Sequence, residues 1–272
     1  MIYICFGIPK TASTFLYQLT EQTFRAGGRR TKWLRPPFRP FDSVDNYFGA
    51  IDGALLARLS ESLESGVDLV LKTHGPLHPE VSRLIESGSV LASASVRDPR
   101  EIALSMLDHG QRTRRWRFPN FSQYRTLADT LPTIDAQIEN FQRWAAAGAR
   151  VFNYNQICFG AAETVKEIAA QIGVAVDPET VLAKFRKRCQ IGQFNKGVAY
   201  RFREMTPADS TMFLARYATF YSSLRFETAA ADRAAAASDP CASRACGEMR
   251  EILTKVRRYF TALRDQRAVL RA

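Results

Sequence analysis

The residues best suited to chemistry follow the first apolar run of the chain. Residues 2–7 read Ile-Tyr-Ile-Cys-Phe-Gly, residues 9–12 read Pro-Lys-Thr-Ala, and a helical pattern begins at Ser13 or Thr14. A strand that leads through a short loop into a helix N-terminus gathers backbone N–H groups and the positive end of the helix dipole, which together bind anions. Lys10 adds a charge, and the neighbouring hydroxyl groups add hydrogen-bond donors. We therefore expect a phosphate- or phosphosulfate-binding loop, although the Gly-Lys pair of the Walker A motif is absent.

A second segment with reactive side chains is residues 70–76, which read Val-Leu-Lys-Thr-His-Gly-Pro. A strand here would bring Lys72 and His74 to its carboxyl end, the edge at which open α/β sheets bind ligands. His74 could act as a general base because imidazole titrates near physiological pH. A structural histidine at a strand end is the alternative, but the nearby lysine and the phosphate-type loop favour the functional interpretation.

A third segment, residues 95–105, contains an arginine and a serine that could bind another phosphate. Arg97 ends a predicted strand, and Pro99 suits the first turn of the next helix. Ser105 lies off the apolar face of that helix, so Ser105 and Arg97 could both reach a phosphate above the sheet edge. The alternative is a surface arginine next to a helix cap at Asp98.

A parallel sheet would bring these segments together. Apolar runs typical of strands occur at 2–7, 67–73, 90–96 and 151–154. Helical patterns lie between and after them, near 13–26, 53–64, 78–87, 99–109, 132–147 and 161–172. This alternation predicts an α/β protein with a P-loop-like three-layer fold, in which helices flank a central parallel sheet.

The end of the chain differs from the rest. We expect one α/β domain over residues 1–227 and an Ala-rich linker over 228–247. Residues 248–272 repeat apolar side chains with helical spacing, which predicts an amphipathic helix. That helix would pack on the domain or on a partner, and a homo-oligomer through it is possible.

Composition limits the class of protein and of partner. Of the 272 residues 46% are hydrophobic and 24% are charged, as in ordinary globular proteins, and no apolar run is long enough to cross a bilayer. A strand predicted from Ile2 leads us to expect no signal peptide, and five cysteines without zinc-type spacing favour reduced thiols in the cytoplasm. The net charge of +11 indicates an anionic partner: nucleic acid, an acidic membrane surface or a polyanionic small ligand.

Arginine and aromatic residues alternate in two segments without regular periodicity, residues 27–50 and 111–125. Such side chains could stack on bases or sugars, or contact an anionic acceptor. Solvated loops anchored by a few aromatic residues are the alternative.

The order of the three reactive segments resembles the sulfotransferase family, which uses 3′-phosphoadenosine 5′-phosphosulfate (PAPS), over about residues 1–226. The family's Pro-Lys-Ser-Gly-Thr-Thr-Trp loop is similar to residues 9–15, with Ala12 in the glycine place and Phe15 in the tryptophan place. Its Lys-Thr-His motif is matched at residues 72–74. Its arginine followed eight residues later by serine is matched by Arg97 and Ser105.

Two later motifs are similar in part. The family's Tyr-Glu-Asp-Met segment near the adenine resembles the Tyr-Asn-Gln-Ile that begins at Tyr154. Its late Arg-Lys-Gly motif is similar to residues 195–197, where Asn195 stands in the arginine place. Arg201 and Arg203 are candidates to replace that arginine.

The resemblance implies an enzyme that moves the sulfuryl group from PAPS to a hydroxyl or amine of a small-molecule, lipid or saccharide acceptor, with PAP as product and without a metal. His74 would be the general base, Lys10 would neutralise the leaving oxygen, and Lys72 would hold that oxygen or the sulfuryl group. Asp108 and His109 are alternative bases. The implied cofactor-binding residues are Lys10, Thr11, Ala12, Ser13, Thr14, Phe15, Arg97, Ser105, Tyr154, Asn195, Lys196 and Gly197.

Two other functions remain as alternatives. A nucleotide phosphotransferase could use a similar loop, but the sequence lacks Gly-Lys-[Ser/Thr] and offers only Asp98 as a Mg²⁺-holding carboxylate after a strand. A non-catalytic protein that binds anions or nucleic acid would explain the charge but would leave Lys72 and His74 without a purpose. We therefore expect no specific nucleic-acid partner.

Overall fold

The computed structural model describes residues 1–34, 44–114, 120–188 and 197–226. The predicted linker over 228–247 and the predicted helix over 248–272 lie outside these residues. Within the described part, no helix combines the length and the apolar character needed to span a bilayer.

A six-stranded parallel sheet forms the centre of the described part, in the order β2-β4-β1-β5-β6, with β3 also paired to β4. The four longer strands are β1 (Ile2–Gly7), β4 (Val67–Thr73), β5 (Val90–Val96) and β6 (Arg150–Asn153). They coincide, within one residue at each end, with the four predicted apolar runs. The central parallel sheet is therefore confirmed.

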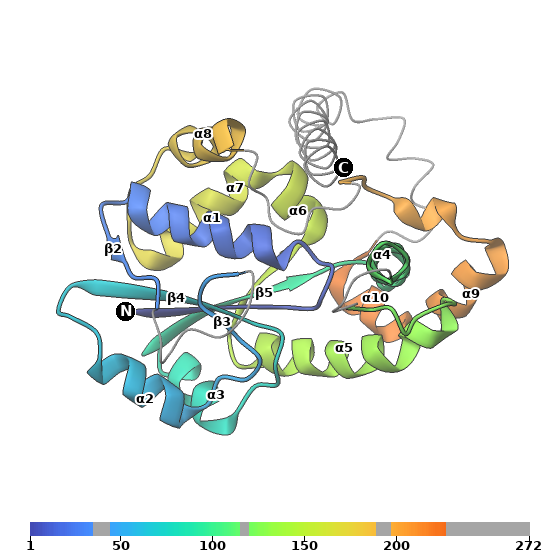
Figure 1. The fold of residues 1–272 in the computed structure, drawn as a ribbon, viewed down its shortest axis with the longest axis horizontal. Coiled ribbons are helices and arrows are strands. Elements are labelled where there is room, and N and C mark those ends of the chain that lie inside the picture. Colours follow the sequence, from blue (N-terminus) through green and yellow to red (C-terminus); the bar gives the residue numbers. More distant parts are fainter. Residues whose placement is uncertain (35–43, 115–119, 189–196, 227–272) are drawn as a thin grey trace, which may run out of the picture.

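Helices cover both faces of the sheet, which gives the predicted three layers (Figure 1). One face carries α1 (Ser13–Ala26), α6 (Tyr154–Phe159), α7 (Ala161–Ile172) and α8 (Pro178–Arg188). The other carries α2 (Gly53–Glu61), α3 (Pro79–Glu86) and α5 (Leu131–Ala146).

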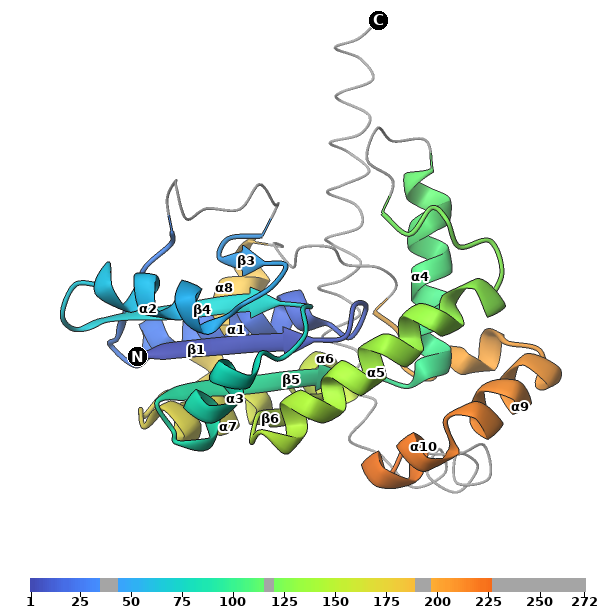
Figure 2. The same ribbon diagram turned by 90° about the horizontal axis from the view of Figure 1, so that it is seen from below.

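A third group of helices lies beyond the carboxyl ends of the strands. It contains α4 (Pro99–Thr113), α9 (Pro207–Arg216) and α10 (Ala218–Leu224), and Figure 2 shows α4 projecting from this end of the sheet. Two short 3₁₀ turns, Ala128–Thr130 and Arg201–Glu204, complete the described elements. The strand ends and these helices together enclose the region where the sequence predicted a ligand.

The central strands are buried on both sides because helices pack on each face. Every residue of β1 and β4 is buried, as expected for strands that read as nearly continuous apolar runs. Trp144 of α5 stacks on Phe6 of β1 with ring centroids 5.2 Å apart, and its indole Nε1 donates to the Gly75 carbonyl oxygen at 3.3 Å. The core thus extends to the loop that follows β4.

The structure differs from three of these expectations, one about an irregular segment and two about helix ends. The segment 27–50 contains the strands β2 (Arg30–Thr31) and β3 (Tyr47–Phe48), which pair with β4 and, at two residues each, are too short to show side-chain alternation. The helix predicted to reach residue 64 ends at Glu61, and α4 continues to Thr113 instead of residue 109. Packing of residues 121–122 against the bare face of Gly110 accompanies this extension.

Candidate active site

The loop between β1 and α1 has the backbone shape of an anion-binding nest. Lys10 (φ 73°) and Ala12 (φ 62°) both adopt the left-handed conformation, on either side of Thr11, and α1 begins directly afterwards at Ser13. Such alternation turns successive N–H groups toward one concavity, and the helix N-terminus adds its dipole. Glycine is required at the start of the loop, because a Cβ on Gly7 would lie 2.2 Å from the Ser95 Oγ atom.

Two of the residues assigned to this loop have side chains with structural contacts. Thr11 is fully buried; its Oγ1 donates to the Ile8 carbonyl oxygen at 2.6 Å and lies 2.7 Å from Ser95 Oγ. Phe15 packs between α1 and α8, with its ring edge-on to Phe185. Any contact of Thr11 or Phe15 with an anion is therefore limited to backbone N–H groups.

Lys72 and His74 meet at the end of β4. The Lys72 Nζ atom lies 2.9 Å from His74 Nε2, and His74 Nδ1 lies 2.5 Å from the Gly7 carbonyl oxygen. Because a carbonyl only accepts, Nδ1 bears the hydrogen and Nε2 is an acceptor. Burial, together with the positive charges of Lys72 and Lys10, lowers the pKa of His74 to about 3. His74 is thus a neutral imidazole whose basic nitrogen faces a lysine.

Lys10 lies close enough to affect both groups. Its Nζ atom is 4.6 Å from the centroid of the Phe121 ring. Burial, and the charges of Arg112 and Lys72, lower the pKa of Lys10 to about 7. No carboxylate of the described residues pairs with Lys10. The site is therefore basic and suits a ligand that brings negative charge.

Sequence reasoning missed Tyr47 and did not single out Phe121. The Tyr47 ring centroid lies 4.7 Å from Lys72 Nζ and 5.6 Å from the His74 ring centroid. Tyr47 belongs to β3, which places it at the site only by pairing with Lys72 on β4. No motif in the sequence signals that contact.

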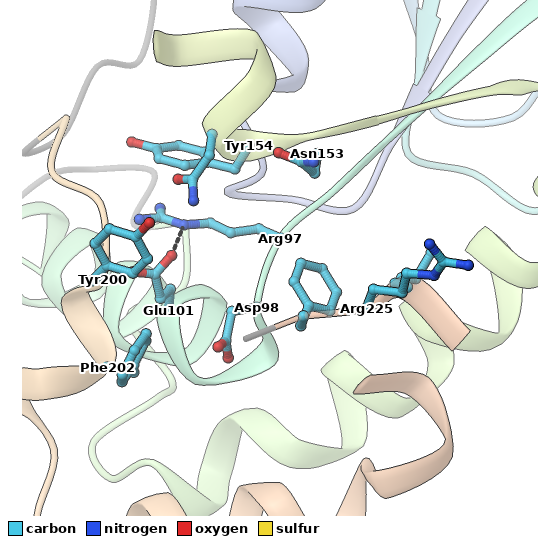
Figure 3. A pocket seen from close by; sticks show the side chains of 11 residues that line it. Arg97, Asp98, Glu101, Asn153, Tyr154, Tyr200, Phe202 and Arg225 are labelled. Carbon is cyan, nitrogen blue, oxygen red and sulfur yellow. Dashed lines mark hydrogen bonds and ion pairs between the residues drawn. The ribbon is translucent and has the colours of Figure 1, made fainter. Parts of the chain in front are cut away.

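Arg97 is buried at the end of β5, not exposed as in the alternative interpretation. Its Nε donates to Glu101 Oε2 at 2.9 Å, its Nη2 donates to the Val198 carbonyl oxygen at 3.3 Å, and its guanidinium lies 3.5 Å from the Tyr154 ring centroid. Figure 3 shows Arg97 between the Tyr154 ring and the Glu101 carboxylate. Glu101 was not expected here, although its spacing of four residues from Arg97 on a helix start was the available signal.

A cavity of about 310 Å³ opens beside Arg97, between the ends of β5 and β6 (Figure 3). It is lined by Arg97, Asp98, Glu101, Asn153, Tyr154, Asn155, Tyr200, Phe202, Leu224, Arg225 and Phe226. The lining combines four aromatic rings with six charged or amide side chains, so the cavity suits a polar ligand that also carries a flat ring. The predicted neighbours Arg97 and Tyr154 thus share one cavity wall.

The remaining predicted nucleotide residues are placed less directly. Ser105 is buried on α4, two turns beyond Arg97. Gly197 directly precedes Val198, whose carbonyl accepts from Arg97, so the late motif reaches this end of the site. Asn195 and Lys196 lie outside the described residues.

The candidates for the missing arginine have other partners. Arg201 is buried and forms ion pairs with Glu204 and with Asp108, both at 2.9 Å. Arg203 lies against the Tyr200 ring at 5.3 Å. Asp108, one of the two alternative bases, is therefore engaged in an ion pair with Arg201.

His109, the other alternative base, lies beside Phe121 and close enough to Lys10 to be affected by its charge. Its ring is edge-on to the Phe121 ring at 5.4 Å. Burial, and the charges of Lys10 and Arg112, lower the pKa of His109 to about 4. His109 is therefore also neutral at physiological pH.

Asp98 is part of a buried network and is poorly suited to hold Mg²⁺. It caps α4 by accepting from the Arg100 backbone N–H at 2.8 Å, pairs with the Arg100 guanidinium at 2.6 Å, and accepts from the Tyr221 hydroxyl at 2.6 Å. The helix cap at Asp98, which the sequence offered as an alternative, is therefore confirmed. Within the described residues, no group of three or more His, Cys, Asp or Glu side chains could hold a metal.

Comparisons with known proteins identify the fold. No protein-family model matches the sequence, and no curated protein matches it. Among solved structures, mouse sulfotransferase SULT7A1 complexed with PAP aligns with a TM-score of 0.53 at 14% identity, over 83% of this chain and 85% of that chain. Retinol dehydratase in complex with retinol and PAP aligns with a TM-score of 0.50 at 12% identity, over 79% of each chain. The same enzyme with androsterone and PAP gives 0.51 at 15% identity, over 80% of this chain and 79% of that chain. The chain therefore has the fold of the PAPS-dependent sulfotransferases.

Proposed function

We propose that this protein is a sulfotransferase that moves the sulfuryl group of PAPS to a hydroxyl or amine of a small-molecule, lipid or saccharide acceptor. The observation that supports this most is the meeting of Lys10, Lys72 and His74 beside the nest-shaped loop, at the carboxyl edge of the sheet. Structures with the same fold were solved with PAP, and two of them with retinol or androsterone. The cytoplasm is the proposed location, and the described cysteines, Cys5 and Cys158, are free thiols.

The residues present fit a nucleotide with phosphate groups at both ends. Backbone N–H groups of the nest and α1 would hold the 5′-phosphate. Arg97 would hold the 3′-phosphate, with Ser105 and the segment 195–197 nearby, and Tyr154 would lie by the adenine. The cavity beside Arg97 is of a size that small ligands occupy. Bound PAPS would supply an activated sulfuryl group, transferred by in-line displacement with little covalent work for the protein.

The protein's own groups would then move one proton and stabilise charge. The acceptor oxygen forms a bond to sulfur while the bond between sulfur and the bridging oxygen breaks, and PAP departs with the released electron pair. His74 Nε2 takes the acceptor's proton, which requires Lys72 to turn from Nε2 toward the donor. Lys10 neutralises the charge that grows on the bridging oxygen. Donors aimed at developing charge are usually the largest catalytic contribution.

The test compares ligands on the intact protein. Isothermal calorimetry should detect binding of PAP and much weaker binding of adenosine 5′-phosphate, which lacks the 3′-phosphate. Acceptor panels with labelled PAPS should then reveal transfer. Stabilisation by ATP–Mg²⁺ but not by PAP would favour a phosphotransferase. Steeply salt-dependent binding to nucleic acid, without nucleotide affinity, would favour the non-catalytic alternative.

A further inference from the structure

Phe121, which is distant from the β1–α1 loop in sequence, adopts a strained backbone conformation directly beside Lys10. Phe121 has φ 65°, in the left-handed region that bulky L-residues rarely occupy. Such a conformation is unfavourable and persists only where the surrounding structure enforces it. Residues in such conformations cluster at functional sites, which points to a functional role for Phe121.

Residues 120–125, here called the strap, are fixed to α4 by several contacts. The Phe121 carbonyl lies against Gly110, where a Cβ would approach its oxygen to 2.2 Å. The Thr113 hydroxyl donates to the Asn120 carbonyl oxygen at 2.8 Å, and Arg114 donates to the Tyr124 carbonyl oxygen at 3.0 Å. The strap's backbone is therefore held against α4 at residues 120, 121 and 124.

This attachment delivers one side chain to the site. The Phe121 ring faces the Lys10 ammonium at 4.6 Å, and the edge-on ring of His109 supports it at 5.4 Å. Lys10 also adopts a left-handed conformation, so strain on two segments 111 positions apart converges on a single contact. Among the described residues no carboxylate pairs with Lys10, and the electron-rich ring face is the group that offsets its charge.

We propose that Phe121 is a positioning residue whose ring holds the Lys10 ammonium ready for the bridging oxygen of the donor. This inference rests on the proposed function. A ring suits the task better than a carboxylate. An ion pair buried with Lys10 would be costly to break, whereas a cation–π contact is weaker and can be exchanged for a stronger partner. The ring therefore aims the lysine and still releases it to the charge of the donor.

The test uses Phe121→Leu, which keeps an apolar side chain without a ring, and Phe121→Tyr, which keeps the ring. In the wild-type protein, the ring current should move the Lys10 ε-methylene NMR signals upfield; Phe121→Leu should abolish that shift and Phe121→Tyr should restore it. The kcat of Phe121→Leu should fall about 2- to 30-fold, the equivalent of one cation–π contact. Its kcat/KM should also begin to fall at lower pH, because the ring no longer stabilises the charged form of Lys10.

A second variant displaces the strap without altering either partner. Gly110→Ala puts a methyl group where the Phe121 carbonyl lies, while alanine favours the helix. It should reduce kcat and the ring-current shift as Phe121→Leu does. Gln111→Ala, at an exposed neighbouring position on α4, is the matched control and should change neither.

Each unfavourable result has a distinct meaning. Absence of the ring-current shift in the wild-type protein overturns the inference whatever the activity. An unchanged kcat in Phe121→Leu, with only the acceptor KM raised, also overturns it and makes Phe121 a wall of the acceptor site. A wild-type protein that shows the shift but neither binds PAP nor transfers sulfate refutes the proposed function, and the inference with it.

Discussion

The two ends of the candidate site treat positive charge in opposite ways. At the end near β1 and β4, Lys10 lies on an aromatic ring and Lys72 contacts a neutral imidazole. At the end near β5, Arg97 is paired with Glu101, and Arg100 with Asp98. The first end has positive charge ready for a ligand, whereas the second has arginines that already have carboxylate partners. A phosphate that binds Arg97 must therefore share it with Glu101.

This difference predicts that substitutions at the first end affect activity alone, whereas substitutions at the second end also affect the stability of the fold. Removing Lys10 takes away a charge that pairs with no carboxylate of the described residues, so the fold should tolerate the change. Removing Arg97 leaves the Glu101 carboxylate buried without its main partner, which should lower the free energy of unfolding by about 3–5 kcal/mol. Variants at the two ends should consequently separate activity from stability.

The largest effects are expected at the first end. His74→Ala and Lys10→Ala should each lower kcat by about 10²–10³-fold or more, because they remove the proposed base and the group proposed to neutralise the leaving oxygen. Steady-state assays with labelled PAPS would measure this, and thermal unfolding should show a folded protein. Normal turnover in His74→Ala would reassign the base to His109 or Asp108 and would contradict the catalytic role proposed for the end near β1 and β4.

The second end should show a loss of binding. Arg97→Ala should weaken PAP affinity by about 10- to 100-fold, as expected for a charged hydrogen-bonded contact, and should also lower the free energy of unfolding. Calorimetry and denaturant titration measure the two effects. Equal PAP affinity in the variant would contradict the assignment of Arg97 to the 3′-phosphate.

A matched pair sharpens that result. Glu101→Gln keeps an acceptor for Arg97 but removes the competing charge, so PAP affinity should rise about 2- to 10-fold, as for one ordinary hydrogen bond. The double variant Arg97→Gln/Glu101→Gln leaves no buried unpaired charge and should recover stability without recovering affinity.

The pH dependence should follow Lys10 and not His74. The pKa of His74 is lowered to about 3, so this proposed base is already deprotonated above about pH 4 and produces no acid limb there. The pKa of Lys10 is lowered to about 7, so kcat/KM should fall as pH rises above that value and the ammonium loses its proton. In Lys10→Arg the guanidinium stays charged, and the basic limb should disappear from whatever activity remains.

The smallest effect concerns the loop backbone. Ala12 occupies a left-handed conformation that glycine adopts without steric cost. Ala12→Gly should therefore raise the free energy of unfolding by about 0.5–1 kcal/mol, measured by urea titration, and should preserve activity. A loss of stability would mean that other contacts of the Ala12 methyl group outweigh the strain.

Local sequence patterns predicted much of the fold and of the candidate site. The four strands could be predicted because a strand covered on both faces must be apolar throughout. The loop before Ser13 could be predicted as a candidate anion site because a strand, a short loop with a lysine and a helix start follow one another in the sequence. The two strands β2 and β3 were not predicted, because two residues are too few to show a pattern in their side chains. Tyr47 was missed for the same reason.

The sequence by itself determined which groups reach the carboxyl edge of the sheet: Lys10 after β1, Lys72 and His74 at the end of β4, and Arg97 at the end of β5. Strand and helix patterns are local, so residue order is enough to place them. Only the tertiary structure decided what those groups face: Phe121 against Lys10, and Gly7 behind the imidazole. Burial, charge and pKa depend on contacts between segments distant in the chain, and no local pattern encodes them.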